Sequence, residues 1–78
     1  MIIPLGEKGM IRRIVGNKIK ILRKARKMTQ EELGNLSNLD RTYITSVERG
    51  KRNISIVNLD RIASALGVEV KDLFNFDE

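Results

Sequence analysis

Two short helical patterns joined by a turn of only four residues constrain the fold of this chain more than any other feature. They lie between Thr29 and Val47, and the tetrapeptide Ser37-Asn38-Leu39-Asp40 turns the chain between them. This spacing is typical of a helix-turn-helix, in which the second helix is carried on the surface of the domain. The stretch therefore predicts two packed helices with one side of the second left available.

Local capping signals mark the ends of these two helices. Thr29 and Glu32 form a capping box, in which hydroxyl and carboxylate bond the free N–H groups of a helix start. Asn38 tolerates the left-handed backbone of a tight turn, and Asp40 is a good N-cap for the second helix. Gly34 costs roughly 1 kcal/mol relative to alanine in mid-helix. We therefore expect another backbone, such as that of a crossing helix, to approach closely there.

The remaining patterns predict an all-α domain of five helices. A first helix begins near residues 11–14 and ends near Lys27, a fourth begins after Ser55 and ends at Gly67, and a short apolar fifth segment follows. No stretch alternates in the manner of a strand. The expected buried positions recur at helical spacing: Ile14, Val15, Ile19, Ile21, Leu22, Ala25, Met28, Leu33, Leu36, Ile44, Val47, Leu59, Ile62, Ala63 and Leu66.

Length and composition narrow the class of protein. We expect residues 1–10 to be a flexible extension and residues 11–78 to be a single small domain, marginal enough in stability that oligomerisation is favoured. The chain has no Cys and no His, which excludes disulfides, imidazole or thiolate metal sites and His-dependent catalysis. We expect no metal, no cofactor and no small-molecule ligand. The sequence lacks a signal-peptide core and a membrane span, so a cytoplasmic protein is expected.

Charge is distributed unevenly along the chain. Residues 1–28 carry nine basic side chains against one acidic, residues 29–52 are balanced, and residues 53–78 carry a net charge of −3. A basic first third suggests a polyanionic partner, although a solvated helix face would give the same pattern. With no Gly-rich phosphate loop and no paired carboxylates in a plausible pocket, an enzyme is disfavoured.

Several linked motifs resemble one known family. They are Met28-Thr29-Gln30-Glu31-Glu32-Leu33, then Thr42-Tyr43-Ile44, Val47-Glu48-Arg49-Gly50 and Leu59-Asp60-Arg61-Ile62-Ala63-Ser64-Ala65-Leu66-Gly67-Val68. Residues 14–74 resemble the Xre/Cro-type phage-repressor helix-turn-helix family, and residues 37–53 are most similar to the controller proteins of restriction–modification systems. The resemblance implies a five-helix lambda-repressor-like domain. The family usually has alanine at Gly34 and glycine at Asn38, and both departures keep the steric requirement.

The resemblance also implies partners. A homodimer would bind double-stranded DNA at a roughly palindromic operator, with two recognition helices about one DNA turn apart. RNA polymerase is left open as a further partner, and no membrane is expected. A phage-type or chromosomal repressor remains an alternative, as does an antitoxin that binds a toxin and regulates its own gene.

Candidate DNA contacts follow from the position of each side chain. Arg41 and Thr42 lie in the first turn of the second helix, where arginine can bond guanine and a threonine methyl can contact thymine; exposure for solubility is the alternative. Thr45 and Ser46, one turn later, are further candidates for the bases. Expected backbone anchors are Gln30, Arg49, Arg52 and Asn53. Tyr43 either packs as core or reaches a phosphate with its hydroxyl, and both can hold.

Two further predictions concern structure rather than DNA. By the family resemblance, Arg23 and Glu48 occupy positions that form an internal ion pair. The apolar end of the chain, Val70, Leu73, Phe74 and Phe76, is expected to form the dimer interface, although it could instead close the core of a single chain.

Overall fold

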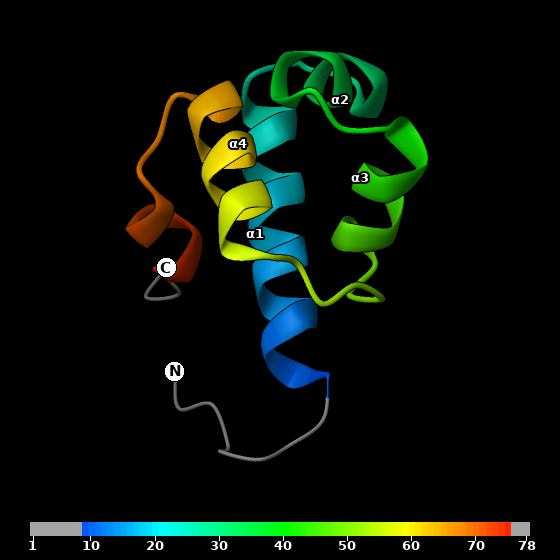
Figure 1. The fold of residues 1–78 in the computed structure, drawn as a ribbon. Coiled ribbons are helices and arrows are strands. Elements are labelled where there is room, and N and C mark those ends of the chain that lie inside the picture. The colour runs from blue at the N-terminus through cyan, green and yellow to red at the C-terminus, as the bar shows by residue number, and fades with distance from the viewer. Residues whose placement is uncertain (1–8, 76–78) are drawn as a thin grey trace.

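In a computed structural model of the chain, residues 9–75 are described and contain four α-helices and one short 3-10 helix. The helices are α1 (Met10–Ala25), α2 (Gln30–Ser37), α3 (Arg41–Glu48) and α4 (Ile56–Leu66), followed by η1 (Val70–Phe74). Figure 1 shows α1 as the central rod, with α3 on one side and η1 on the other. No helix within residues 9–75 is long and apolar enough to cross a membrane.

The predicted capping residues stand at the helix ends. Thr29 and Glu32 form the capping box of α2, with Thr29 Oγ1 accepting from Glu32 N at 3.0 Å. Asp40 caps α3, Ser55 caps α4, and the left-handed Gly67 ends α4. Each of these signals depends on a few adjacent residues, which is why the sequence alone locates them.

The expectation of five α-helices is wrong. The fifth segment, η1, is a 3-10 helix, in which each backbone N–H bonds a carbonyl three residues earlier. Asp72 N donates to Glu69 O, while Asp72 Oδ2 accepts from Glu69 N at 2.9 Å. These two bonds close a single tight turn. α1 begins at Met10, one residue inside the predicted extension; residues 1–8 lie outside the described part of the chain.

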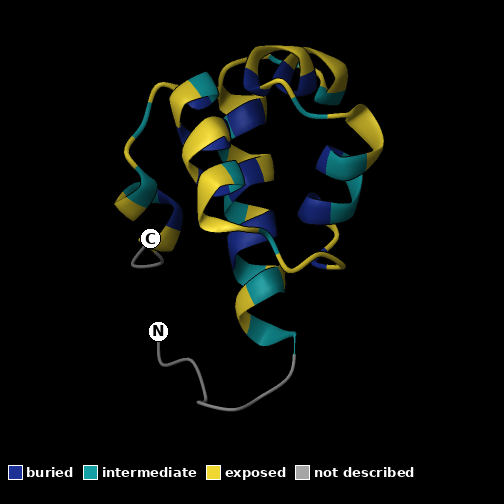
Figure 2. Cartoon of the chain, viewed as in Figure 1, coloured by how far each residue is buried: buried dark blue, intermediate teal, exposed yellow. Residues whose placement is uncertain are grey.

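The core lies where α1, α2, α3, α4 and η1 meet, and buried positions line their inner faces (Figure 2). Its fully buried large side chains are Ile19, Leu33, Ile44, Ile62, Leu66 and Leu73. The predicted core was too broad, because Ile21, Ala25 and Leu36 are exposed. Ile21 and Leu36 recur at helical spacings, but each lies on the outer side of a helix whose inner side already faces the core.

Two glycines permit close packing around the helix-turn-helix. A Cβ on Gly34 would lie 2.7 Å from the Leu39 carbonyl oxygen, so the close approach expected there comes from the turn after α2 and not from a crossing helix. A Cβ on Gly16 would overlap the Val47 carbonyl oxygen, which brings α1 directly against the end of α3. Asn38 adopts the predicted left-handed conformation, with φ of 59°. These contacts fix how α3 sits on the rest of the domain.

Candidate nucleic-acid interface

The first turn of α3 carries the two side chains expected to meet bases. Arg41 and Thr42 are both exposed. The N-cap Asp40 holds the turn by accepting a hydrogen bond from Thr42 N at 2.9 Å. Neither side chain is turned inward or covered by another part of residues 9–75. The arrangement is therefore open to a duplex along this edge of the molecule.

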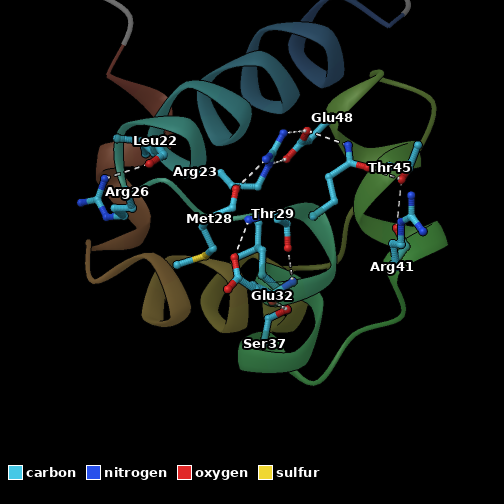
Figure 3. A network of polar contacts seen from close by, with 12 residues as sticks. Leu22, Arg23, Arg26, Met28, Thr29, Glu32, Ser37, Arg41, Thr45 and Glu48 are labelled. Carbon is cyan, nitrogen blue, oxygen red and sulfur yellow. Dashed lines mark hydrogen bonds and ion pairs between the residues drawn. The ribbon is translucent and has the colours of Figure 1, made fainter.

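A buried ion pair fixes the other end of α3. Arg23 Nε donates to Glu48 Oε2 at 2.7 Å, and Arg23 Nη2 donates to Glu48 Oε1 at 3.1 Å (Figure 3). Arg23 also donates from Nη1 to the Met28 carbonyl at 2.7 Å. The pair that the family resemblance implied thus joins α1 to α3. Because Glu48 is buried against a guanidinium, its negative charge does not face the surface where phosphates would lie.

Gln30 and Thr45 extend this pair toward the exposed side of α3. Gln30 Nε2 donates to Glu48 Oε1 at 3.0 Å, and Thr45 Oγ1 donates to Gln30 Oε1 at 2.8 Å. The Thr45 hydroxyl also lies 3.1 Å from the Arg41 carbonyl. Gln30, expected only as a backbone anchor, therefore also connects α2 to α3. Its amide keeps a second N–H that could still reach a phosphate.

Tyr43 is held in place by two neighbours. Its hydroxyl accepts a hydrogen bond from Asn58 Nδ2 at 3.0 Å, and the Arg52 guanidinium lies 4.7 Å from the centre of its ring. The ring packs partly against the core, which is the first of the two interpretations that the sequence analysis gave for Tyr43. Because Asn58 donates, the tyrosine keeps its own O–H for an outside acceptor. The other interpretation, a phosphate contact, therefore remains compatible with this geometry.

The segment that follows α3 presents further polar side chains. Arg49, Arg52 and Asn53 are exposed, and Ser46 is half-buried on α3. Gly50 adopts a left-handed conformation with φ of 74° against Arg13 of α1, which turns the chain away from α3. The basic side chains expected as anchors thus follow directly from the end of the helix that would enter the groove.

The expected dimer residues divide into two groups. Leu73 is fully buried in the core of its own chain, so for this residue the alternative of core closure is correct. Val70 is half-buried and Phe74 is 42% exposed, while Phe76 lies outside the described residues. Ile56 and Val57 at the start of α4, which the sequence analysis did not single out, are 80% and 61% exposed. The sequence shows them as two consecutive apolar residues outside the repeating apolar positions of α4.

Ser37, predicted as part of the turn, is the last residue of α2, so only Asn38, Leu39 and Asp40 connect α2 to α3. This combination of four packed helices, a three-residue turn and an exposed second helix defines a helix-turn-helix protein. Residues 19–73 match the helix-turn-helix family designated HTH_3, and the chain belongs to this family. The match covers most of the chain.

Particular relatives are restriction–modification control proteins. The chain is 48% identical over 61 residues to the control protein C.MunI of Mycoplasma sp, covering 77% of this chain and 82% of that protein. It is 45% identical over 67 residues to the control protein C.BamHI of Bacillus amyloliquefaciens, covering 85% and 83%. The crystal structure of the restriction–modification controller C.AhdI from Aeromonas hydrophila superposes with a TM-score of 0.80 at 44% identity, covering 81% and 96%.

Proposed function

We propose that this protein is a sequence-specific transcriptional regulator that acts as the controller of a restriction–modification system. The observation that carries the proposal is the exposed first turn of α3, with Arg41 and Thr42 outward and the far end of the same helix fixed by the Arg23–Glu48 pair. A rigidly held helix with polar side chains at its start is suited to reading bases in the major groove. The likeness to C.MunI, C.BamHI and C.AhdI supports the narrower assignment.

The proposed contacts divide by the part of DNA they meet. Arg41 and Thr42 read base edges, with Thr45 and Ser46 behind them on the same helix. Backbone phosphates are bound by Gln30, Tyr43, Arg49, Arg52 and Asn53. Because Arg52 stacks on Tyr43, both side chains are already oriented before DNA arrives. This limits the entropy lost on binding.

The proposed assembly is a homodimer on a two-fold symmetric operator. A domain of this size has reason to bury its exposed apolar side chains against a second copy. We assign the contact to Val70 and Phe74 on η1, with Ile56 and Val57 as the alternative surface. Phe74→Glu should yield monomers in sedimentation equilibrium if η1 forms the interface. If only Ile56→Glu does so, the interface lies on α4, and a dimer that survives both changes excludes both surfaces.

Footprinting on the DNA upstream of the protein's own gene tests the function. We expect protection of two half-sites whose centres lie one or a whole number of helical turns apart, about 34 Å per turn. Arg41→Ala should abolish this protection, whereas Arg61→Ala, which removes an exposed arginine of α4, should preserve it. If the unaltered protein protects no segment of the upstream DNA, the proposal is refuted.

The genes beside this one test the narrower assignment. A neighbouring methyltransferase and endonuclease would fit a controller. Their absence, together with phage genes, would favour a phage-type repressor with the same DNA-binding surface. In either case the activity resides in binding, and the proposal includes no enzymatic step.

A further inference from the structure

Four polar side chains form a continuous chain of hydrogen bonds from the interior to the exposed side of α3. In order they are Arg23, Glu48, Gln30 and Thr45, and Figure 3 shows the ion pair at one end and Thr45 at the other. Each link has a direction, because some of these groups can only donate and others can only accept. The direction at the buried end therefore determines what the exposed end can offer.

The buried end is fixed by chemistry alone. A guanidinium has five N–H donors and no acceptor, and an ionised carboxylate only accepts. Glu48 therefore receives bonds from Arg23 and must receive another from Gln30, whose amide nitrogen lies 3.0 Å from Glu48 Oε1. A flipped amide would place its oxygen against the carboxylate, with both groups acceptors. The NH2 group of Gln30 consequently faces Glu48.

The orientation of Gln30 determines that of Thr45. With its nitrogen toward Glu48, Gln30 presents its oxygen to the Thr45 hydroxyl at 2.8 Å. Within residues 9–75, the other hydrogen-bond partner of this hydroxyl is the Arg41 carbonyl at 3.1 Å, which is also an acceptor. A hydroxyl has a single hydrogen. Whichever oxygen takes that hydrogen, the protein retains it and only lone pairs remain for an outside partner.

We propose that Thr45 is a specificity-determining residue that reads DNA as an obligate hydrogen-bond acceptor. The inference rests on the proposed function, in which α3 lies in the major groove. There, adenine N6 and cytosine N4 are the donors, whereas guanine and thymine present acceptors at the corresponding edges. A free threonine hydroxyl can bond either kind. The polar chain removes that freedom, so Thr45 bonds the amino group of the adenine or cytosine in the base pair it meets and distinguishes base pairs by where in the groove that group lies. Gln30 and Glu48 are positioning residues.

Base preferences test this assignment directly. Selection from randomised duplexes identifies the operator position whose preference disappears in Thr45→Val, a change that removes the hydroxyl at nearly constant shape. Each base pair carries one major-groove amino group, on its adenine or its cytosine, and we expect Thr45 to bond that group. Replacing the base by an analogue that lacks only its exocyclic amino group should weaken wild-type binding about two- to tenfold, the range for one ordinary hydrogen bond. The same analogue should not affect Thr45→Val.

Two substitutions at Gln30 separate this role from a merely structural one. Gln30→Glu keeps an acceptor facing Thr45, so the base preference should persist, even though a carboxyl beside Glu48 weakens binding overall. Gln30→Met removes the acceptor, so the affinity lost on deleting the amino group should fall, because the freed hydroxyl can donate to a base acceptor instead. A purely structural role predicts the reverse order, with the larger defect in Gln30→Glu.

The outcomes distinguish this inference from the function beneath it. Unchanged preferences at every position in Thr45→Val would overturn the inference while leaving DNA binding intact. Insensitivity of the unaltered protein to the amino-deleted base would do the same without relying on any variant. Absence of sequence-specific binding would refute the proposed function and this inference with it.

Discussion

Removing the carboxylate of Glu48 should destabilise the fold severely, because it leaves the buried guanidinium of Arg23 without its counter-charge. Glu48 accepts two bonds from Arg23 and one from Gln30, and its side chain is 2% exposed. Loss of one partner of a buried pair costs about 3–5 kcal/mol. Since Arg23 keeps its bond to the Met28 carbonyl, we expect the lower end for Glu48→Ala, about 3 kcal/mol. For a domain of this size, that lowers Tm by about 12–24 °C.

Thermal and urea unfolding followed by circular dichroism measures this loss. Protein concentration must be held constant, because dimerisation would also raise the apparent stability. Lys71→Ala is the matched control, since Lys71 lies 4.0 Å from Glu69 with both side chains mostly exposed. Such a pair contributes at most about 1 kcal/mol. The control should therefore melt close to the unaltered protein.

A double substitution separates the stranded charge from general damage. Replacing both partners, as in Arg23→Met with Glu48→Met, leaves no buried charge without a partner and should recover at least half of the stability lost in Glu48→Ala. Melting of Glu48→Ala within about 2 °C of the unaltered protein, well below the shift expected for a stranded charge, would refute the reasoning. So would a double variant less stable than the single one.

Three further predictions concern backbone fit and DNA. Gly16→Ala should lower the free energy of unfolding by at least about 1–3 kcal/mol, because the added Cβ would overlap the Val47 carbonyl. An unchanged urea unfolding curve would contradict the tight contact between α1 and α3. Lys27 has a left-handed φ of 55°, which glycine adopts without strain, so Lys27→Gly should raise the free energy of unfolding by up to about 1 kcal/mol in the same assay. As a control, Lys24→Gly within α1 should lower the free energy of unfolding by about that amount. Arg52→Ala should lower the slope of log affinity against log salt by about one per half-site. A slope that does not change would show that Arg52 makes no phosphate contact.

The sequence predicted those parts of the fold that depend on neighbouring residues. The Thr29 capping box, the Asp40 and Ser55 caps and the left-handed Asn38 all arise from interactions within a few positions. The Arg23–Glu48 pair came from family resemblance, since composition and spacing alone do not bring residues 25 positions apart together. Capping residues near one another in the sequence therefore locate the helix-turn-helix, and the family pattern locates its buried Arg23–Glu48 ion pair.

Features that depend on three-dimensional packing could not be predicted in the same way. Gly16 is one residue within a long helix, and its contact with Val47 exists only once α1 and α3 are packed. The bond between Gln30 and Thr45 joins different helices, so no sequence spacing indicates it. Leu36 fits a helical period but faces outward, because which side meets the core depends on where neighbouring helices lie.

The central claim is that the first turn of α3 reads DNA sequence. The most direct test is the ratio of affinities for the operator and for a scrambled duplex at one salt concentration, measured for the unaltered protein and for Arg41→Ala with Thr42→Ala. The unaltered protein should prefer its operator by about a thousandfold or more. The variant should lose most of that preference while still binding both duplexes through phosphates. A folded variant with an unchanged ratio would contradict the account.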